Sequence, residues 1–410
     1  MQKRMGSVET LPAPADAVKI IDEAFSFDVQ AEEVSLMEAK GRSLAEDVLA
    51  DEYLPVFNRS GMDGYSVYAT DLEGATKDNP VTLPLAGEVL MGEAADTPLA
   101  KGSCVYTPTG AAVPEGTESV IMVEDTKKND DGTISFYKDI EAGKNVILKG
   151  SDVFPGKKVL SKGRILNIAD IGSLAALGYT KVKVAKKPLV GIISTGDELI
   201  EISEQPKNGQ VRDINSTTLA LAVEEAGGIA KNYGIVKDEE DKLTAFVKNA
   251  IDECDMVLIS GGSSMGEKDA TEQIIESFGT LVLHGIRMKP GKPTIVGNVD
   301  GKPVIGVPGN PVSAYFVTRV FVKKILFKMI GAKAEELFVD AILTQDVKEN
   351  KQRSKFDFAK LSAKDWTTYA EPVKTQSGLM TSMAECDAFF VTQLGNGDRK
   401  EGEKVTVHPL

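Results

Sequence analysis

Between residues 189 and 313, four short loops that carry chemically useful side chains each follow a run of apolar residues. The loops span residues 194–199, 237–241, 260–269 and 308–313. The run before each loop, such as residues 304–307, has the apolar, β-branched composition of a buried strand. Loops after parallel strands meet at one edge of a sheet, so we expect these four loops to form one site.

The first two loops supply carboxylates. Asp197 and Glu198 follow the first strand, and Asp238 is the acidic residue nearest the end of the second. Carboxylate oxygens are the ligands that a hard cation such as Mg²⁺ prefers. Each loop alone is equally compatible with a helix cap or a solvated helix start, where Thr, Asp and Glu are also favoured.

The third loop is rich in glycine and serine. Gly261, Gly262 and Ser263 would let the backbone approach phosphate oxygens closely, and Asp269 ends the loop just before a predicted helix. The GxxxxGK[ST] pattern of a Walker A loop is absent. A flexible turn is the alternative interpretation of this segment.

The fourth loop, Pro308-Gly309-Asn310-Pro311, leads to Ser313 in the next predicted helix. Its two prolines fix φ on either side of a Gly-Asn pair, which makes the loop stiff, although the same residue types form ordinary turns. The nearby turn at 287–293 contains Lys289 and Lys292 and would supply positive charge. A basic surface turn is the alternative for that segment.

Taken together, the four loops and the basic turn indicate phosphoryl or nucleotidyl chemistry assisted by Mg²⁺. They combine a backbone suited to phosphate, carboxylates suited to a cation, and local positive charge. The chain has two histidines, His284 and His408, so catalysis by a histidine-based triad is not expected.

The composition is that of a globular protein with several domains. The chain has 410 residues, 42% hydrophobic and 26% charged, a length that predicts roughly two to four domains. Its formal net charge of −14 argues against a nucleic-acid-binding protein, which would normally show a basic surface. Its three cysteines form no CxxC pair, and neither a signal peptide nor a membrane span is apparent. We therefore expect a cytoplasmic protein with no nucleic-acid or membrane partner.

The order of predicted elements indicates a multidomain fold that combines α/β and β-rich parts. Strands and helices alternate through 187–335, which predicts a doubly wound α/β domain with a mainly parallel sheet. Residues 50–155 carry short strand-like runs punctuated by Pro and Gly and predict a β-rich domain. Residues 336–410 predict a small β-barrel or sandwich. We interpret residues 1–49 and 156–186 as N-terminal linking segments and helices.

Seven motifs follow one another in the order found in a single enzyme family. They lie at 58–65, 107–111, 113–116, 194–199, 260–269, 289–293 and 308–313. With these motifs the chain resembles the molybdopterin molybdenumtransferases, the MoeA-like proteins, which are related to the E domains of plant and animal homologues. The resemblance runs through almost the whole chain, and seven motifs in sequence are highly specific.

The resemblance implies a homodimer of L-shaped form, with four domains in each protomer and a central domain of the molybdopterin-binding fold. It implies that adenylylated molybdopterin and molybdate react, with a divalent cation such as Mg²⁺, to give molybdenum cofactor and AMP. Other proteins of the cofactor pathway would be partners. Asp63 and Thr109 in the β-rich domain would reach the site of the other protomer.

The resemblance also implies roles for individual residues. Glu198, Asp238 and Asp269 would hold the metal and, with Asp63, form the catalytic set. The substrate would be contacted by Thr109, Asp197, Gly261, Gly262, Ser263, Lys289, Lys292, Pro308, Asn310, Pro311, Ser313, Arg353 and Ser377. Gly261 and Ser263 would line the pterin phosphate, whereas the group from Lys289 to Ser313 would lie by the molybdate and the dithiolene.

Two other functions stay open beside this one. A molybdopterin adenylyltransferase would share the α/β domain, but its simpler enzymes lack the additional β-rich domains. A scaffold that binds partner peptides would be a non-enzymatic alternative.

The chain also departs from some family members, which carry a lysine four residues before Lys289, where Gly285 stands here. Arg287 is the candidate to supply that charge.

Overall fold

Strands and helices alternate through the centre of the chain and build one six-stranded sheet. The structure is a computed structural model, and it describes residues 7–261, 270–333, 337–374 and 378–410. In sheet order the strands are β16 (Ile229–Val236), β13 (Leu189–Thr195), β17 (Met256–Ser260), β21 (Lys302–Val307), β20 (Ile295–Val299) and β18 (Thr280–His284). The first four run parallel to one another, whereas β20 runs antiparallel to β21 and β18. The predicted, mainly parallel sheet is confirmed.

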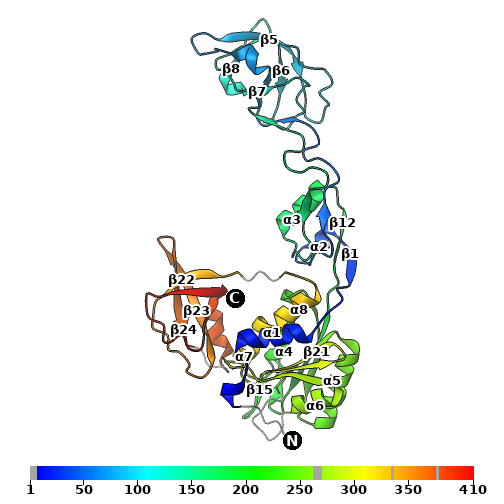
Figure 1. Cartoon of the computed structure of the whole chain (residues 1–410), viewed down its shortest axis with the longest axis vertical. Helices are drawn as coiled ribbons and strands as arrows, with labels where there is room; N and C mark the ends of the chain where they lie inside the picture. Colours follow the sequence, from blue (N-terminus) through cyan, green and yellow to red (C-terminus); the bar gives the residue numbers. More distant parts are fainter. Residues whose placement is uncertain (1–6, 262–269, 334–336, 375–377) are drawn as a thin grey trace. The chain divides into compact units, whose positions relative to one another are not determined.

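Helices cover both faces of this sheet (Figure 1). One face packs against α1 (Pro14–Ala24), α4 (Asn215–Glu225), α7 (Pro311–Val317) and α8 (Lys323–Met329), and the other against α5 (Glu240–Glu253) and α6 (Ala270–Phe278). Ile192 and Leu258 point to the first core, whereas Ile193 and Ile259 point to the second. Burial on both faces explains why these strands are apolar without alternation. Each such side chain contributes about 1.5–3 kcal/mol by leaving water.

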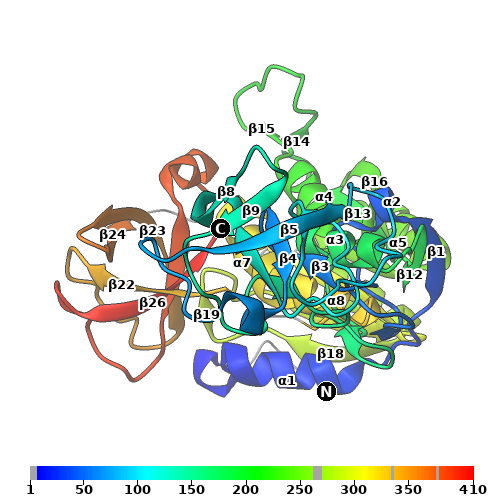
Figure 2. The same cartoon turned by 90° about the horizontal axis from the view of Figure 1, so that it is seen from above.

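A closed β-barrel follows the α/β domain. Its strands are β22 (Val339–Leu343), β23 (Ser354–Lys364), β24 (Thr367–Val373), β25 (Ala388–Thr392) and β26 (Lys404–Pro409). The sheet closes because β23 pairs with β24 along one part of its length and with β25 along another. Figure 2 shows β22, β23, β24 and β26 grouped together. The predicted barrel-like domain is confirmed.

The barrel is joined to the α/β domain by an aromatic cluster and a short strand. The ring of Phe316 in α7 lies 4.7 Å from that of Phe358 and 5.3 Å from that of Phe356, both on β23. Beside this cluster, β19 (Met288–Lys289) pairs in parallel with the start of β23. Arg319, in the π-helical turn η4 (Thr318–Val322), donates to the carbonyl oxygen of Pro409 at the end of β26. These contacts attach the barrel to the α/β domain through the helix that follows β21.

Contacts within the chain divide it into two units, of which the first contains residues 1–46, 162–166 and 182–410. This unit holds the α/β domain, the barrel and a small N-terminal piece made of β1 (Ala31–Ser35), α2 (Leu36–Ala39) and β12 (Lys181–Ala185). The second unit contains residues 47–161 and 167–181. The helix α1 lies alongside β18 (Figure 2).

The second unit is rich in β-structure, as its sequence predicts. One six-stranded sheet has the order β7 (Ser119–Met122), β4 (Gly64–Val67), β6 (Cys104–Thr107), β5 (Val81–Glu88), β9 (Thr133–Phe136) and β8 (Thr126–Lys128). Short pairs are formed by β3 (Arg59–Ser60) with β10 (Val146–Ile147), and by β2 (Val48–Leu49) with β11 (Lys158–Leu160). The helix α3 (Ile168–Ala176) begins at an Asn167–Asp170 capping box and is followed by Gly178 at φ 77°, a left-handed conformation in which glycine commonly ends a helix.

Within the ranges that the structure describes, no helix combines the length and the apolar character that crossing a bilayer would require.

Candidate functional site

The strand order reverses beside β13, and the predicted loops lie at this place. Because β16 and β17 flank β13 on opposite sides, the chain leaves β13 and β17 toward opposite faces of the sheet. Doubly wound sheets bind ligands outside the carboxyl ends of their strands at such a reversal. Residues 196–198, 237–238, 261 and 308–310 directly follow β13, β16, β17 and β21. The described parts of the four predicted loops therefore share one sheet edge.

On the acidic side of this edge, β13 holds the end of β16. Thr195 Oγ1 donates to Asp238 Oδ1 at 2.6 Å, and the Asp238 backbone N–H faces Asp197 Oδ1 at 3.4 Å. Lys237 Nζ donates to the carbonyl oxygen of Asp197 at 3.1 Å. Asp197, Glu198 and Asp238 are exposed. The carboxylates from two separate loops are thus brought together at the surface.

The third and fourth loops approach each other closely. Gly261 has φ 102°, and a β-carbon there would lie 2.0 Å from the carbonyl oxygen of Thr195. Only glycine fits this position without displacing the backbone. A β-carbon on Gly309 would lie 3.6 Å from Gly261 Cα, so the two loops are in van der Waals range. Glycine at position 261 therefore lets the end of β17 pack against Thr195 and the fourth loop, and the Gly261 backbone N–H donates to the Val307 carbonyl oxygen at 3.2 Å.

Asn215 joins these two loops, and sequence reasoning missed it. Its Nδ2 donates to Ser260 Oγ at 2.7 Å and to the carbonyl oxygen of Gly309 at 2.9 Å. Asn215 is the first residue of α4 and does not follow a strand of the main sheet, so the strand-end rule passed over it. A signal was present nearby, since Asp213 accepts from the Ser216 backbone N–H, the usual pattern of a capping residue.

On the basic side, Lys289 lies in β19, which pairs with the first strand residues of β23 in the barrel. The parallel pairing of β19 with β23 places Lys289 beside Lys355. Arg353 directly precedes β23, and its Nε is buried with no hydrogen-bond partner among the residues described. Arg287 Nε donates to the carbonyl oxygen of Gln352 at 2.7 Å, and this hydrogen bond ties the basic turn to the segment before β23. Lys289 thus lies on β19 beside β23, and Arg353, predicted from a distant segment, directly precedes β23.

A buried carboxylate, also missed from the sequence, lies in the same row. Strand alternation places Lys355 and Asp357 on one face of β23, just after Arg353. Lys355 Nζ pairs with Asp357 Oδ1 at 2.8 Å, whereas Asp357 Oδ2 has no partner in the described parts of the chain. Burial raises the pKa of Asp357, although the positive charges of Lys355 and Lys289 oppose the change.

The remaining predicted substrate contacts are distributed around the fourth loop. Pro308 is buried, Asn310 is exposed, and Pro311 begins α7. Ser313 lies in the first turn of that helix and is 4% exposed. Lys292 is half-buried, and its carbonyl oxygen accepts from the Ile286 backbone N–H. Four predicted residues lie outside the described residues: Gly262, Ser263, Asp269 and Ser377.

The carboxylates suit a hard cation by their chemistry. Among the described residues, no group of three or more Asp, Glu, His or Cys side chains is close enough to hold a metal ion. Asp269, the third predicted ligand, is not among those residues. Glu198 and Asp238 would supply two carboxylates from neighbouring strand ends, which is the number that Mg²⁺ commonly takes from a protein when it keeps several waters.

Two further predicted residues lie together in the second unit. Thr109 donates to Asp63 Oδ1 from its backbone N–H at 2.7 Å and from its Oγ1 at 2.9 Å. These hydrogen bonds, the backbone one first, lower the pKa of Asp63. The side chains belong to motifs 46 residues apart, and the pairing of β4 with β6 places them side by side.

Comparison with known protein families accounts for almost the whole chain. Residues 13–178 match the MoeA N-terminal region (domain I and II), and residues 340–410 match the MoeA C-terminal region (domain IV). Residues 191–328 match a family described as a probable molybdopterin binding domain. A molybdopterin molybdenumtransferase of Haemophilus influenzae is 33% identical over 392 residues, covering 95% of this chain and 96% of that protein. The chain belongs to the MoeA family of molybdopterin molybdenumtransferases.

Other members of the family agree in sequence and in fold. The molybdopterin molybdenumtransferase of Bacillus subtilis is 32% identical, with 97% of this chain and 94% of that protein covered. The crystal structure of the molybdopterin biosynthesis MoeA protein from Pyrococcus horikoshii superposes with a TM-score of 0.87 at 33% identity. That comparison covers 98% of this chain and 100% of the other. The chain is therefore an enzyme of this family, with the MoeA fold along its length.

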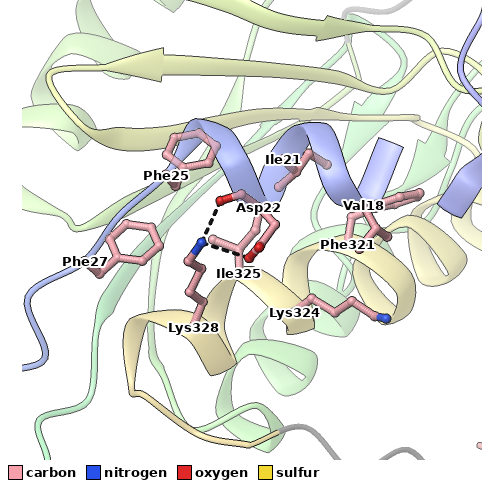
Figure 3. A pocket seen from close by; sticks show the side chains of 9 residues that line it. All are labelled: Val18, Ile21, Asp22, Phe25, Phe27, Phe321, Lys324, Ile325 and Lys328. Atoms are coloured by element: carbon pink, nitrogen blue, oxygen red, sulfur yellow. Dashed lines mark hydrogen bonds and ion pairs between the residues drawn. The ribbon is translucent and has the colours of Figure 1, made fainter. Parts of the chain in front are cut away.

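A separate pocket in this MoeA-family chain lies away from the loops. It is lined by Val18, Ile21, Asp22, Phe25, Phe27, Phe321, Lys324, Ile325 and Lys328, from α1, η4, α8 and the segment after α1 (Figure 3). Lys328 Nζ donates to the Asp22 backbone oxygen at 2.6 Å and to Asp22 Oδ1 at 2.8 Å. The other walls are mainly aromatic and aliphatic, so this pocket does not offer the groups that the predicted chemistry needs.

Proposed function

We propose that the chain inserts molybdate into adenylylated molybdopterin, releasing AMP and giving molybdenum cofactor, with a divalent cation such as Mg²⁺. Its membership of the MoeA family, which belongs to molybdenum cofactor biosynthesis, supports this proposal. The observation that carries this proposal is the shared sheet edge, where Asp197, Glu198 and Asp238 face the ends of β13 and β16. Gly261 and Gly309 follow the adjoining strands at the same edge.

The charges around this edge suit the reaction. A water oxygen would bond to the AMP phosphorus as the phosphoanhydride bond to the pterin phosphate breaks. The bridging oxygen would stay on the pterin phosphate, and AMP would leave with the oxygen taken from water. The Gly261 backbone N–H donates to the Val307 carbonyl oxygen and is therefore occupied. The exposed backbone of the fourth loop at Gly309, which has no side chain to block the approach, would contact phosphate oxygens. Lys289, beside Lys355, would attract molybdate, a tetrahedral dianion, within an otherwise acidic chain.

The carboxylates would serve the cation. Glu198 and Asp238, with Asp269, would hold Mg²⁺, which neutralises phosphate charge when it is bound. The hydrogen bond from Thr195 occupies Asp238 Oδ1 and orients the carboxylate. The chain's own role here is to orient these carboxylates toward the substrate.

The decisive test measures AMP release from adenylylated molybdopterin as molybdate is added. Glu198→Gln and Asp238→Asn should each lower the rate by about 100-fold or more, as expected for losing a ligand of an essential cation. Glu201→Gln, an exposed acid just beyond β14 (Leu199–Ile200), is the matched control and should leave the rate unchanged. Unchanged AMP release in both site variants would instead favour the scaffold function.

A second assay separates the two enzymatic functions. The wild-type protein is incubated with ATP and molybdopterin, without adenylylated substrate. We expect no adenylylated pterin to form on the time scale of the first assay. Its rapid formation would identify the chain as an adenylyltransferase and contradict the proposal.

We also propose that the chain is a homodimer with sites shared between protomers, and that it works in the cytoplasm. Asp63 and Thr109 then complete the site of the partner, and the unpaired thiols of Cys104, Cys254 and Cys386 suit a reducing compartment. Mixing Asp63→Asn protein with Glu198→Gln protein should restore AMP release, because mixed dimers contain one intact site. If the mixture is as inactive as either variant alone, the shared site is wrong.

A further inference from the structure

The amide of Asn215 connects two loops that are far apart in the sequence. It bonds Ser260 across 45 residues and Gly309 across 94 residues. Asn215 is 5% exposed, so both hydrogen bonds are shielded from water. Each hydrogen bond replaces one that the same group makes to water in the unfolded chain, and its typical net contribution to folding stability is about 1 kcal/mol. The side chain therefore holds the end of β17 against the start of the fourth loop.

The orientation of the amide follows from its partners. The Gly309 carbonyl oxygen can only accept a hydrogen bond, so it must face the NH₂ group of Asn215. A flipped amide would place two carbonyl oxygens against each other. A carboxamide is suited to this position because one nitrogen carries two hydrogens for two acceptors. The same orientation determines which amide atom has no hydrogen-bond partner.

The amide atom without a hydrogen-bond partner is the side-chain carbonyl oxygen of Asn215. Asn215 Oδ1 is buried and has no hydrogen-bond partner among the residues that the structure describes. Ser194 Oγ, aligned with Ser260 on the neighbouring strand, is also buried without such a partner. Leaving a buried acceptor unpaired costs about 1–3 kcal/mol. A ligand that brings an N–H donor to this oxygen recovers that cost, which makes Asn215 Oδ1 a recognition point.

We propose that Asn215 is a positioning residue that clamps the Gly261 and Gly309 loops together and offers its carbonyl oxygen to an N–H donor of the pterin ring system. This inference rests on the proposed function, because it takes molybdopterin as the ligand of the shared sheet edge. The pterin ring carries amide and amine N–H groups, which match a buried acceptor. The clamp itself is a property of the ligand-free protein and can be measured separately.

The test uses the full chain and two measurements. Hydrogen exchange of peptides containing Gly261 and Gly309 reports the clamp, and the Kd for molybdopterin reports recognition. Asn215→Leu removes both functions of the amide, whereas Asn215→Asp keeps an acceptor and loses the donors. The matched control is Asn232→Asp, an exposed Asn whose Oδ1 caps the Gly234 backbone N–H and therefore survives the change. Ser260→Ala, which removes one partner of the amide, gives a milder variant in case the Asn215 variants fail to fold.

We expect both Asn215→Leu and Asn215→Asp to raise the exchange rate by about tenfold, as the loss of one or two buried hydrogen bonds implies. The molybdopterin Kd should rise by about tenfold in Asn215→Leu and by less in Asn215→Asp, which keeps an acceptor. Ser260→Ala should shift both in the same direction by less, and Asn232→Asp should match wild type. Faster exchange with unchanged Kd would overturn the recognition role, and unchanged exchange would overturn the clamp. If wild type binds no molybdopterin, the proposed function fails, and the exchange data still decide the clamp.

Discussion

Thr109 directs both its backbone N–H and its hydroxyl to a single oxygen of Asp63, at 2.7 and 2.9 Å. The two donors stabilise the charged carboxylate, which is why the pKa of Asp63 is lowered. Because the folded value lies below the unfolded one, the contact stabilises the fold above the ordinary Asp pKa of about 3.9. That contribution is lost as the pH falls through the lowered pKa. Asp63 is thus an anion at any pH at which the enzyme would work.

Thr109→Val should raise the pKa of Asp63 toward its ordinary value, because one of the two donors is removed. Carbon-13 NMR titration of the Asp carboxyl groups measures this shift. Thr133→Val is the matched control, since Thr133 makes the same pair of bonds to Asp131 in the same unit, at 3.0 and 2.7 Å. Both variants should raise the pKa of their own Asp, but only Thr109→Val should slow AMP release. Equal activity in the two variants would remove Asp63 from the proposed site.

Gly261→Ala should destabilise the protein more than Gly209→Ala and should disrupt the site. Both glycines have positive φ, so both substitutions strain the backbone by about 1–2 kcal/mol. Only at Gly261 would the new β-carbon also meet a backbone atom, the Thr195 carbonyl oxygen at 2.0 Å, because Gly209 has open space. Thermal unfolding and AMP release measure the two effects. Equal behaviour of the variants would mean that the close packing at Gly261 is unimportant.

Lys289→Ala should raise the molybdate concentration needed for half-maximal AMP release by about tenfold or more, as expected when a cation facing a dianion is lost. Molybdopterin binding should change much less. Lys364→Ala is the control, because Lys364 is an exposed cation at the far end of β23. An equal loss of molybdate and pterin binding in Lys289→Ala would refute the assigned role.

Asp357→Asn should gain stability relative to wild type as the pH rises. Burial raises the pKa of Asp357, so the folded state keeps its proton to a higher pH than the unfolded state, and wild-type stability falls between the two pKa values. Asparagine does not titrate and avoids this loss. Melting temperatures of both proteins across the acidic range measure the difference. A relative loss by the variant at higher pH would show that the attraction of Lys355 and Lys289 outweighs burial.

Much of the fold was predictable because it rests on local patterns. The apolar runs that became β13, β17 and β21 are buried on both faces, and such strands are recognisable from composition alone. The acids and glycines that follow them were recognisable because a parallel sheet places its strand ends on one edge. The antiparallel course of β20 was not predicted, since direction depends on the partner strand rather than on the strand's own residues.

The sequence by itself determined which residue types stand at the strand ends, and so the carboxylate, glycine and lysine chemistry available to the site. Only the tertiary structure decided which of them meet. The Asn215 amide reaches Ser260 and Gly309 from the start of a helix, and Asp357 lies by Lys289 through the pairing of β19 with β23. Such contacts depend on strand order and register, which are set by packing across the whole unit and leave no periodic trace in the chain.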